Sequence, residues 1–135
     1  MPTVKKLTFV VLLIAGLSFT AFSQNNQIPQ EIIVSLGNGD SKVLSNYFNQ
    51  NVELVVLDND NVYSKAQAQQ IVNNFFTNFR PVAENAFTII HDGGKEGAKY
   101  VIGNLKTNNG NFRVYFLLKQ NSGKDYIHQL RIEKK

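Results

Sequence analysis

The clearest pattern in the chain is an apolar stripe at helical spacing near its middle. The stripe consists of Ala68, Ile71, Val72, Phe75, Phe76 and Phe79. Ser64 and Gln67 stand three residues apart just before it, which is the signature of a helix capping box. Pro81 follows Arg80 and ends the pattern, because proline cannot continue a helix. The segment therefore predicts a long amphipathic helix whose stripe packs against another element.

Two shorter helical patterns precede this long helix. The first begins at Pro29 and ends at Gly37 and Gly39, since proline suits a first turn and glycine a helix end. Its apolar face holds Ile28, Ile32 and Leu36. The second begins at Asp40 or Ser41, either of which can cap it. Its apolar face is expected to hold Val43, Leu44, Tyr47 and Phe48.

The remaining apolar residues follow the two-residue period of strands. A first strand at 52–57, a turn at 58–61 and a short return strand at 62–63 lie before the long helix. Four more strands are predicted after it, at 86–91, 99–106, 112–119 and 125–133. The breaks at 92–94, 108–110 and 121–123 are short and contain glycine, which predicts antiparallel hairpins. Helices separate from a run of antiparallel strands predict an α+β fold. A curved antiparallel sheet with the long helix in its concave face would bury every apolar stripe.

The first 23 residues have the pattern of a cleaved secretory signal. Lys5 and Lys6 precede an apolar stretch at 7–17, and Ala21 and Ser23 supply small residues just before Gln24. The competing interpretation is an uncleaved membrane anchor, but a spanning helix needs about 20 apolar residues. We therefore expect a signal peptide at 1–23, cleaved between Ser23 and Gln24, and one domain at 24–135. Such a protein would be periplasmic or extracellular, without a stable membrane anchor.

Composition narrows the chemistry further. The 135 residues include no cysteine, which excludes thiolate catalysis, iron–sulfur clusters and cysteine-based zinc sites. The formal net charge of +4 falls to +2 without Lys5 and Lys6, so we expect no nucleic-acid partner. We also expect no cofactor and no metal.

Several local markers are typical of one superfamily. These are Tyr47-Phe48 before the first strand, the 62–67 entry to the long helix, and the closing run of strands. Over residues 28–133 the chain resembles the nuclear-transport-factor-2-like (NTF2-like) superfamily, also called ketosteroid-isomerase-like or SnoaL-like. With the signal pattern, it is similar to a secreted bacterial domain-of-unknown-function family of that fold. The resemblance implies a cone-shaped, cystatin-like α+β barrel with a pocket at its open end, and dimers formed through the outer sheet face.

The same resemblance offers a test for enzymatic activity. Steroid isomerases of the superfamily carry a general-base carboxylate on the first strand, and alignment on Phe48 places that base at or beside Val56. The nearest acids are Asp58, in the predicted turn, and Glu53, which faces the opposite side of a regular strand. The expected base is therefore missing. The enzymatic alternative is an isomerase- or cyclase-like protein with a relocated base, for which His128, Asp58 and Tyr100 are the weak candidates.

His91 and His128 are the only imidazoles in the chain. One hypothesis makes them an acid/base or metal-ligand pair with Asp58 or Asp92. The simpler interpretation makes His91 a turn residue and His128 a partly buried strand residue. On a regular strand His128 would be in phase with residues 126, 130 and 132. An Asp-Asn repeat at 58–61 does not continue as a calcium loop and is interpreted as a turn.

The candidate ligand-binding residues are aromatic or lie near aromatic residues. They are Tyr63, Phe76, Tyr126 and His128, which would line a pocket for a small apolar ligand. The phenylalanines of the long helix fit a hydrophobic core at least as well as a ligand-stacking group.

The strand at 112–119 predicts an interaction surface. Its apolar phase, from Phe112 to Leu118, must face the long helix, so Arg113, Tyr115 and Leu117 point outward. Such a face can be solvated, line a pocket or form a homodimer interface, and the last is the alternative we carry forward. The sequence as a whole predicts a secreted, non-catalytic module for binding a small ligand or a protein.

Overall fold

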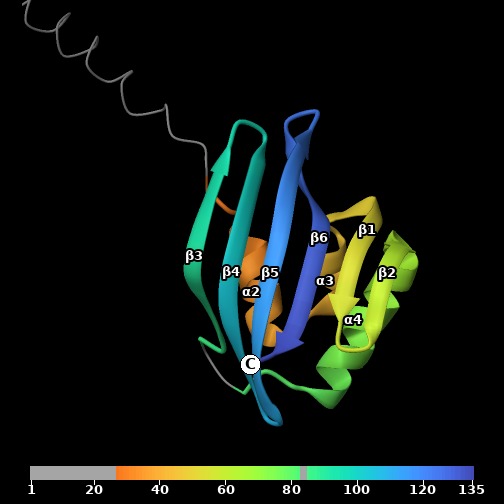
Figure 1. Ribbon diagram of the computed structural model, residues 1–135, viewed down its shortest axis with the longest axis vertical. Coiled ribbons are helices and arrows are strands. Elements are labelled where there is room, and N and C mark those ends of the chain that lie inside the picture. Colours follow the sequence, from red (N-terminus) through yellow and green to blue (C-terminus); the bar gives the residue numbers. More distant parts are fainter. Residues whose placement is uncertain (1–26, 83–84) are drawn as a thin grey trace, which may run out of the picture.

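The computed structural model describes residues 27–82 and 85–135 (Figure 1). The predicted signal peptide and the bond between Ser23 and Gln24 lie outside these residues. The described chain forms helices α2 (Gln30–Asn38), α3 (Ser41–Ser45) and α4 (Lys65–Asn78). No helix in these parts of the chain is both long and apolar enough to cross a membrane.

The predicted caps of the helices are confirmed. Gly39 ends α2 with a φ of 70°, a left-handed conformation that glycine adopts without strain. The Asp40 side chain accepts a hydrogen bond from the backbone N–H of Val43 and begins α3. At the start of α4, the Ser64 hydroxyl accepts from the Gln67 N–H, and the Gln67 side chain accepts from the Ser64 N–H, both at 3.2 Å. The capping box therefore sets the first residue of α4.

The strands form one six-stranded curved sheet that does not close into a barrel. They are β1 (Phe48–Val56), β2 (Asn59–Ser64), β3 (Phe87–Lys95), β4 (Ala98–Thr107), β5 (Gly110–Asn121) and β6 (Lys124–Lys134). Their order across the sheet is β2-β1-β6-β5-β4-β3. Strands β3 to β6 form the predicted antiparallel run. Because β1 pairs in parallel with β6, the sheet is mixed rather than antiparallel as predicted.

The predicted turn at 92–94 is wrong. The chain turns at 96–97, and β3 continues to Lys95 through both Gly93 and Gly94. Each glycine has a packing reason. A Cβ on Gly93 would lie 2.8 Å from the Tyr100 hydroxyl, and one on Gly94 would lie 2.3 Å from the Ala98 carbonyl oxygen. These glycines therefore permit close contacts inside a strand rather than a reversal of the chain.

The second predicted helix ends earlier than expected. α3 stops at Ser45, and Phe48 begins β1 instead of sharing a helical face with Leu44. Phe48 pairs with Ile127 of β6, and the register shifts before Glu53. This extra length of β1 is possible because the first part of β6 offers it a partner, which the local pattern at 48–51 does not reveal.

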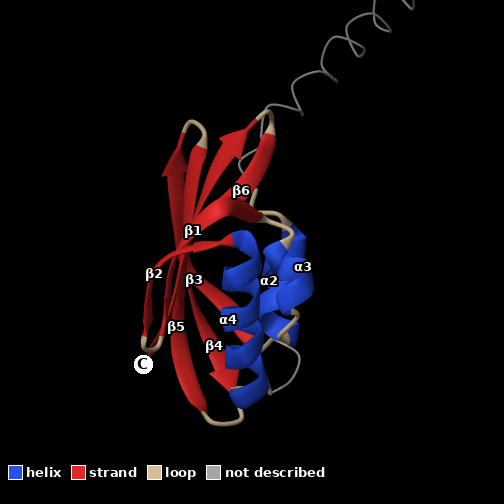
Figure 2. Ribbon diagram, turned by 90° about the vertical axis from the view of Figure 1, so that its right-hand side faces the viewer, coloured by secondary structure: helices blue, strands red, loops and turns tan. Residues whose placement is uncertain are grey.

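All three helices cover one face of the sheet and leave the other face bare (Figure 2). The inward apolar side chains of β1, β4, β5 and β6 pack against the helices and are at most 2 % exposed. Phe75 and Phe79 of α4 contact Phe112 of β5, with ring centroids 5.0 and 4.9 Å apart. The phenylalanine stripe is thus part of the hydrophobic core, and the helices fill the cone.

Candidate functional site

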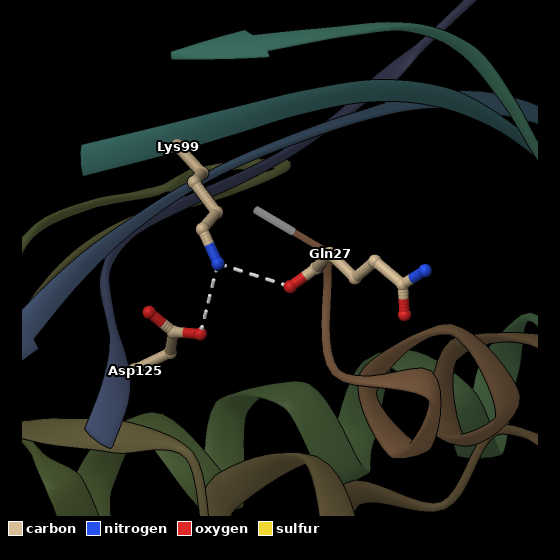
Figure 3. Close-up of polar contacts among 3 residues, drawn as sticks. All are labelled: Gln27, Lys99 and Asp125. Carbon is tan, nitrogen blue, oxygen red and sulfur yellow. Dashed lines mark hydrogen bonds and ion pairs between the residues drawn. The ribbon is translucent and has the colours of Figure 1, made fainter. Parts of the chain in front are cut away.

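A buried ion pair lies at the end of the sheet that carries the turns at 96–97 and 122–123. Lys99 of β4 and Asp125 of β6 approach to 3.3 Å, and their side chains are only 9 % and 14 % exposed. The Lys99 ammonium also donates to the Gln27 carbonyl at 3.0 Å (Figure 3). The pair therefore ties the segment before α2 to two strands of the sheet. We call this region the hairpin end.

Two surface hollows lie on either side of this segment. One has a volume of about 390 Å³ and is lined by Ile28, Lys99 and the last residues of β3. The other has a volume of about 410 Å³ and is lined by Pro29, Asp125 and Tyr126, among others. Since Ile28 and Pro29 are adjacent, the chain between Gln27 and α2 forms the wall between the two hollows.

The second of these hollows, which we call the tyrosine hollow, contains another polar contact. The Tyr47 hydroxyl donates to the Glu31 carboxylate at 2.5 Å. This hydrogen bond raises the pKa of Tyr47 to about 12, with burial and the negative charge of Glu31 acting in the same direction. The bond joins α2 to the start of β1 and holds the Tyr47 ring in one orientation.

The bare face of the sheet, which we call the outer face, carries the predicted interface residues. Phe112, Val114, Phe116 and Leu118 are fully buried beneath the helices, so Arg113, Tyr115 and Leu117 point outward as the alternation predicts. The register pairs Tyr115 with Ile102. It likewise pairs Leu117 with Tyr100. These four side chains form a half-buried apolar cluster across β4 and β5 on a face that no helix covers.

Asn104 lies beside this cluster, opposite Arg113. Its side-chain oxygen is the one buried side-chain acceptor in the described residues that has no hydrogen-bond partner. An unpaired buried acceptor costs about 1–3 kcal/mol, so the outer face carries a polar group that the isolated chain does not satisfy.

Both histidines lie on the outer-face side of the sheet, but neither occupies the backbone position that was predicted for it. His91 sits inside β3, opposite Ile102, and its Nε2 is 2.8 Å from the Tyr100 hydroxyl. His128 sits in a bulge of β6, where two residues oppose Leu117 between the buried Ile127 and Leu130. The predicted phase of His128 with residues 130 and 132 is therefore wrong. Burial lowers the pKa of His128, and the nearby Lys119 lowers it further.

The candidate catalytic residues are not brought together. Tyr100 contacts His91 rather than His128. Asp58 follows Leu57, whose N–H donates to Ile132. Ile132 is four residues along β6 from His128, and four strand residues span about 13 Å. Asp58 is therefore far from His128. Among the described residues, no three His, Cys, Asp or Glu side chains gather as a metal site.

The candidate ligand residues occupy three different environments. Phe76 is in the core and only 4 % exposed, and Tyr63 packs against the edge of that core. His128 is on the outer-face side, and Tyr126 lines the tyrosine hollow. The structure therefore does not gather these four residues into one pocket.

The sequence interpretation missed Lys99, Glu31 and Gln27. A signal for Lys99 was present, because it occupies the inward phase of β4 with Val101 and Leu105. A lysine at an inward position needs an acidic partner, and Asp125 stands in the inward phase of β6, two residues before Ile127. The contact of Glu31 with Tyr47 depends on how α2 lies against the sheet and has no comparable local signal.

A curved sheet with helices on one face defines the class of this protein, the NTF2-like fold. An NTF2-like protein of unknown function from Shewanella baltica is similar in structure, with a TM-score of 0.58. It is 16% identical in sequence, and the match covers 78% of this chain and 86% of that chain. At this level of sequence identity, the similarity supports the fold and not a shared function.

The chain belongs to the family DUF4783, described as a domain of unknown function, whose model matches residues 29–133. A DUF4783 family protein from Bacteroides ovatus is 34% identical, with a TM-score of 0.75, over 82% of this chain and 98% of that chain. One from Bacteroides uniformis is 31% identical, with a TM-score of 0.74, over 81% and 98%. No curated protein matches the chain. The resemblance to the NTF2-like superfamily and to a domain-of-unknown-function family of that fold is confirmed.

Proposed function

We propose that this domain is a non-catalytic interaction module that associates with a second copy of itself through the outer face of its sheet. The observation that carries the proposal is the half-buried cluster of Tyr100, Ile102, Tyr115 and Leu117 on a face that no helix covers. Aromatic and arginine side chains around an apolar centre are the usual composition of an interface core and its border.

The charges around this cluster favour a second copy as the partner. The outer face carries charges of both signs on neighbouring strands. The cations are Lys106, Arg113, Lys119 and Arg131, and the acids are Glu53 and Glu133. A face with both signs can meet itself across a two-fold axis with opposite charges opposed. A strongly basic or acidic partner would meet like charges on the same face.

The filled cone and the scattered candidate residues support a non-catalytic role. The inward apolar side chains of β1, β4, β5 and β6 are at most 2 % exposed, so the described part of the chain has no open route into the cone. Of the weak catalytic candidates, His128 lies in β6, whereas Asp58 follows Leu57, which bonds to Ile132, four residues further along β6. A general base must lie within hydrogen-bond reach of its proton and its partners.

The experiment is a charge substitution at the centre of the cluster. Tyr115→Glu places a carboxylate in the apolar centre and is expected to weaken self-association at least tenfold, while circular dichroism stays unchanged. Asn74→Glu, on the exposed side of α4, adds the same charge away from the outer face and should leave association unchanged. Equal association of the Tyr115→Glu variant and the unmodified protein would contradict the proposal.

We also propose that the module is exported and cleaved between Ser23 and Gln24. The support is the order of the basic, apolar and small-residue segments in positions 5–23. Mass spectrometry of the exported protein should find a chain that begins at Gln24. A chain that retains the first 23 residues after export would contradict cleavage.

A further inference from the structure

The tyrosine hollow has the properties of a small-molecule site that is separate from the outer face. Its volume of about 410 Å³ falls within the range of about 300–1,000 Å³ that is common for ligand pockets. Its lining combines two half-buried aromatic residues with polar groups of both kinds. The residues that the argument uses are Glu31, Asn46, Tyr47, Lys124, Asp125 and Tyr126.

Two of the lining groups are held in place before any ligand arrives. Tyr47 is fixed by its hydrogen bond to Glu31, and Asp125 is fixed by its ion pair with the buried Lys99. A preorganised wall reduces the entropy lost on binding, because fewer side chains must be ordered by the ligand. The hydrogen bond and the ion pair involve different elements, and the hollow is lined jointly by α2, the turn before β1 and the start of β6.

The charges of the hollow determine the kind of ligand. Glu31 and Asp125 are acids, whereas Lys124 lines the hollow and Lys99 lies directly against Asp125. An anion would meet the Glu31 carboxylate, and a cation would meet Lys124. The formal charges balance, which favours a neutral ligand. Since Lys124 donates, the carboxylates accept and Asn46 does both, the ligand should carry groups that both donate and accept.

We propose that the tyrosine hollow binds a neutral saccharide. The hydroxyls of a sugar ring both donate and accept hydrogen bonds, which matches the mixed polar lining. Its C–H faces are apolar and pack well against tyrosine rings. The Tyr47 hydroxyl, which donates to Glu31, can still accept a hydrogen bond from a sugar hydroxyl. This proposal does not depend on self-association, because Tyr47 and Tyr126 are not part of the outer-face cluster.

The test is a titration followed by the backbone amide signals in NMR. The purified protein receives maltotriose, cellotriose or triacetylchitotriose, each to about 10 mM, a concentration that reveals sites of millimolar affinity. At least one should shift the amides of Asn46 and Tyr126 in a saturable way. Tyr126→Ala should weaken this binding at least tenfold. Tyr47→Phe, which keeps the ring and loses the bond to Glu31, should weaken it less.

A matched control separates this proposal from the proposed function. Tyr115→Ala removes a tyrosine from the outer face and should leave the saccharide titration unchanged. Shifts confined to the outer face, or equal binding by the Tyr126→Ala variant, would overturn the saccharide site but not self-association. The absence of shifts with all three sugars would overturn it as well. Saturable shifts of the same amides with choline or inorganic phosphate in place of sugar would overturn the neutral-ligand assignment.

Discussion

Lys99 and Asp125 form an ion pair that water barely reaches, and this makes their interdependence measurable. Removing one charge leaves the other buried without its partner. We expect Asp125→Asn to lower the free energy of unfolding by about 2–3 kcal/mol. Urea denaturation, followed by circular dichroism, measures the change.

An exposed ion pair in the same sheet provides the control. Arg131 and Glu133 approach to 3.6 Å, but their side chains are 50 % and 53 % exposed. Surface pairs contribute about 0–1 kcal/mol, so Glu133→Gln should have a small effect. Equal losses from Asp125→Asn and Glu133→Gln would show that the burial of Lys99 is not important for stability.

Tyr47 provides a residue-scale test by pH. Its pKa of about 12 lies above the ordinary value of 10.0 because the neutral hydroxyl donates to Glu31. A group whose pKa is raised on folding stabilises the protein below its unfolded pKa, and this contribution is lost as the pH rises through the folded pKa. The stabilising effect of Tyr47 is therefore present below pH 10 and lost between about 10 and 12.

The ultraviolet absorbance of tyrosinate measures this titration directly. We expect one of the five tyrosines to ionise near pH 12, and Glu31→Gln to bring that step back toward 10. Phe substitution of Tyr47 should remove the late step altogether. If the late step persists in the Tyr47→Phe variant, another tyrosine is responsible and the contact with Glu31 is not.

At the scale of the element, the capping box of α4 sets where the long helix begins. Ser64→Ala removes the hydroxyl that accepts from the Gln67 N–H and should cost about 1 kcal/mol of stability. Thr77→Ala, also in α4, removes a hydroxyl that only donates to the Asn73 carbonyl within the helix. Thermal unfolding should show the larger loss for Ser64→Ala, and the reverse order would contradict the role of the cap.

The elements themselves follow closely from the pattern of the sequence, because caps and apolar periods are local. α4 and the order of the strands β3 to β6 were predictable for that reason. The pairing of β1 with β6 was not, since it joins segments about 75 residues apart and depends on how the sheet assembles. The bulge at His128 reverses the phase of a strand without any glycine or proline to mark it.

Of the two candidate sites, one could be predicted from the local sequence pattern and the other could not. The outward direction of Arg113, Tyr115 and Leu117 follows from alternation along one strand, so the sequence predicts it. The tyrosine hollow combines α2, the turn before β1 and the start of β6, which are distant in the chain. No periodic pattern links Glu31 with Tyr126, and only the folded arrangement shows that they share a hollow.

At the scale of the whole molecule, the two faces of the sheet have different roles. The helices fill the concave side of the sheet and supply a core that leaves no open route into the cone of the described chain. The other side remains bare and carries an apolar cluster bordered by charges of both signs. The two proposed sites therefore lie on the outside of the domain, one on the outer face and one at the hairpin end.

Sedimentation equilibrium of the unmodified protein tests this account most directly. If the outer face is an interface between two copies, the protein should sediment as a dimer at about 100 μM and dissociate on dilution, as a standard-size interface of micromolar affinity would. The Tyr115→Glu variant should remain a monomer across the same range. A single monomeric species of the unmodified protein at about 100 μM would contradict the central claim, and Tyr115 and Leu117 would then be ordinary surface residues.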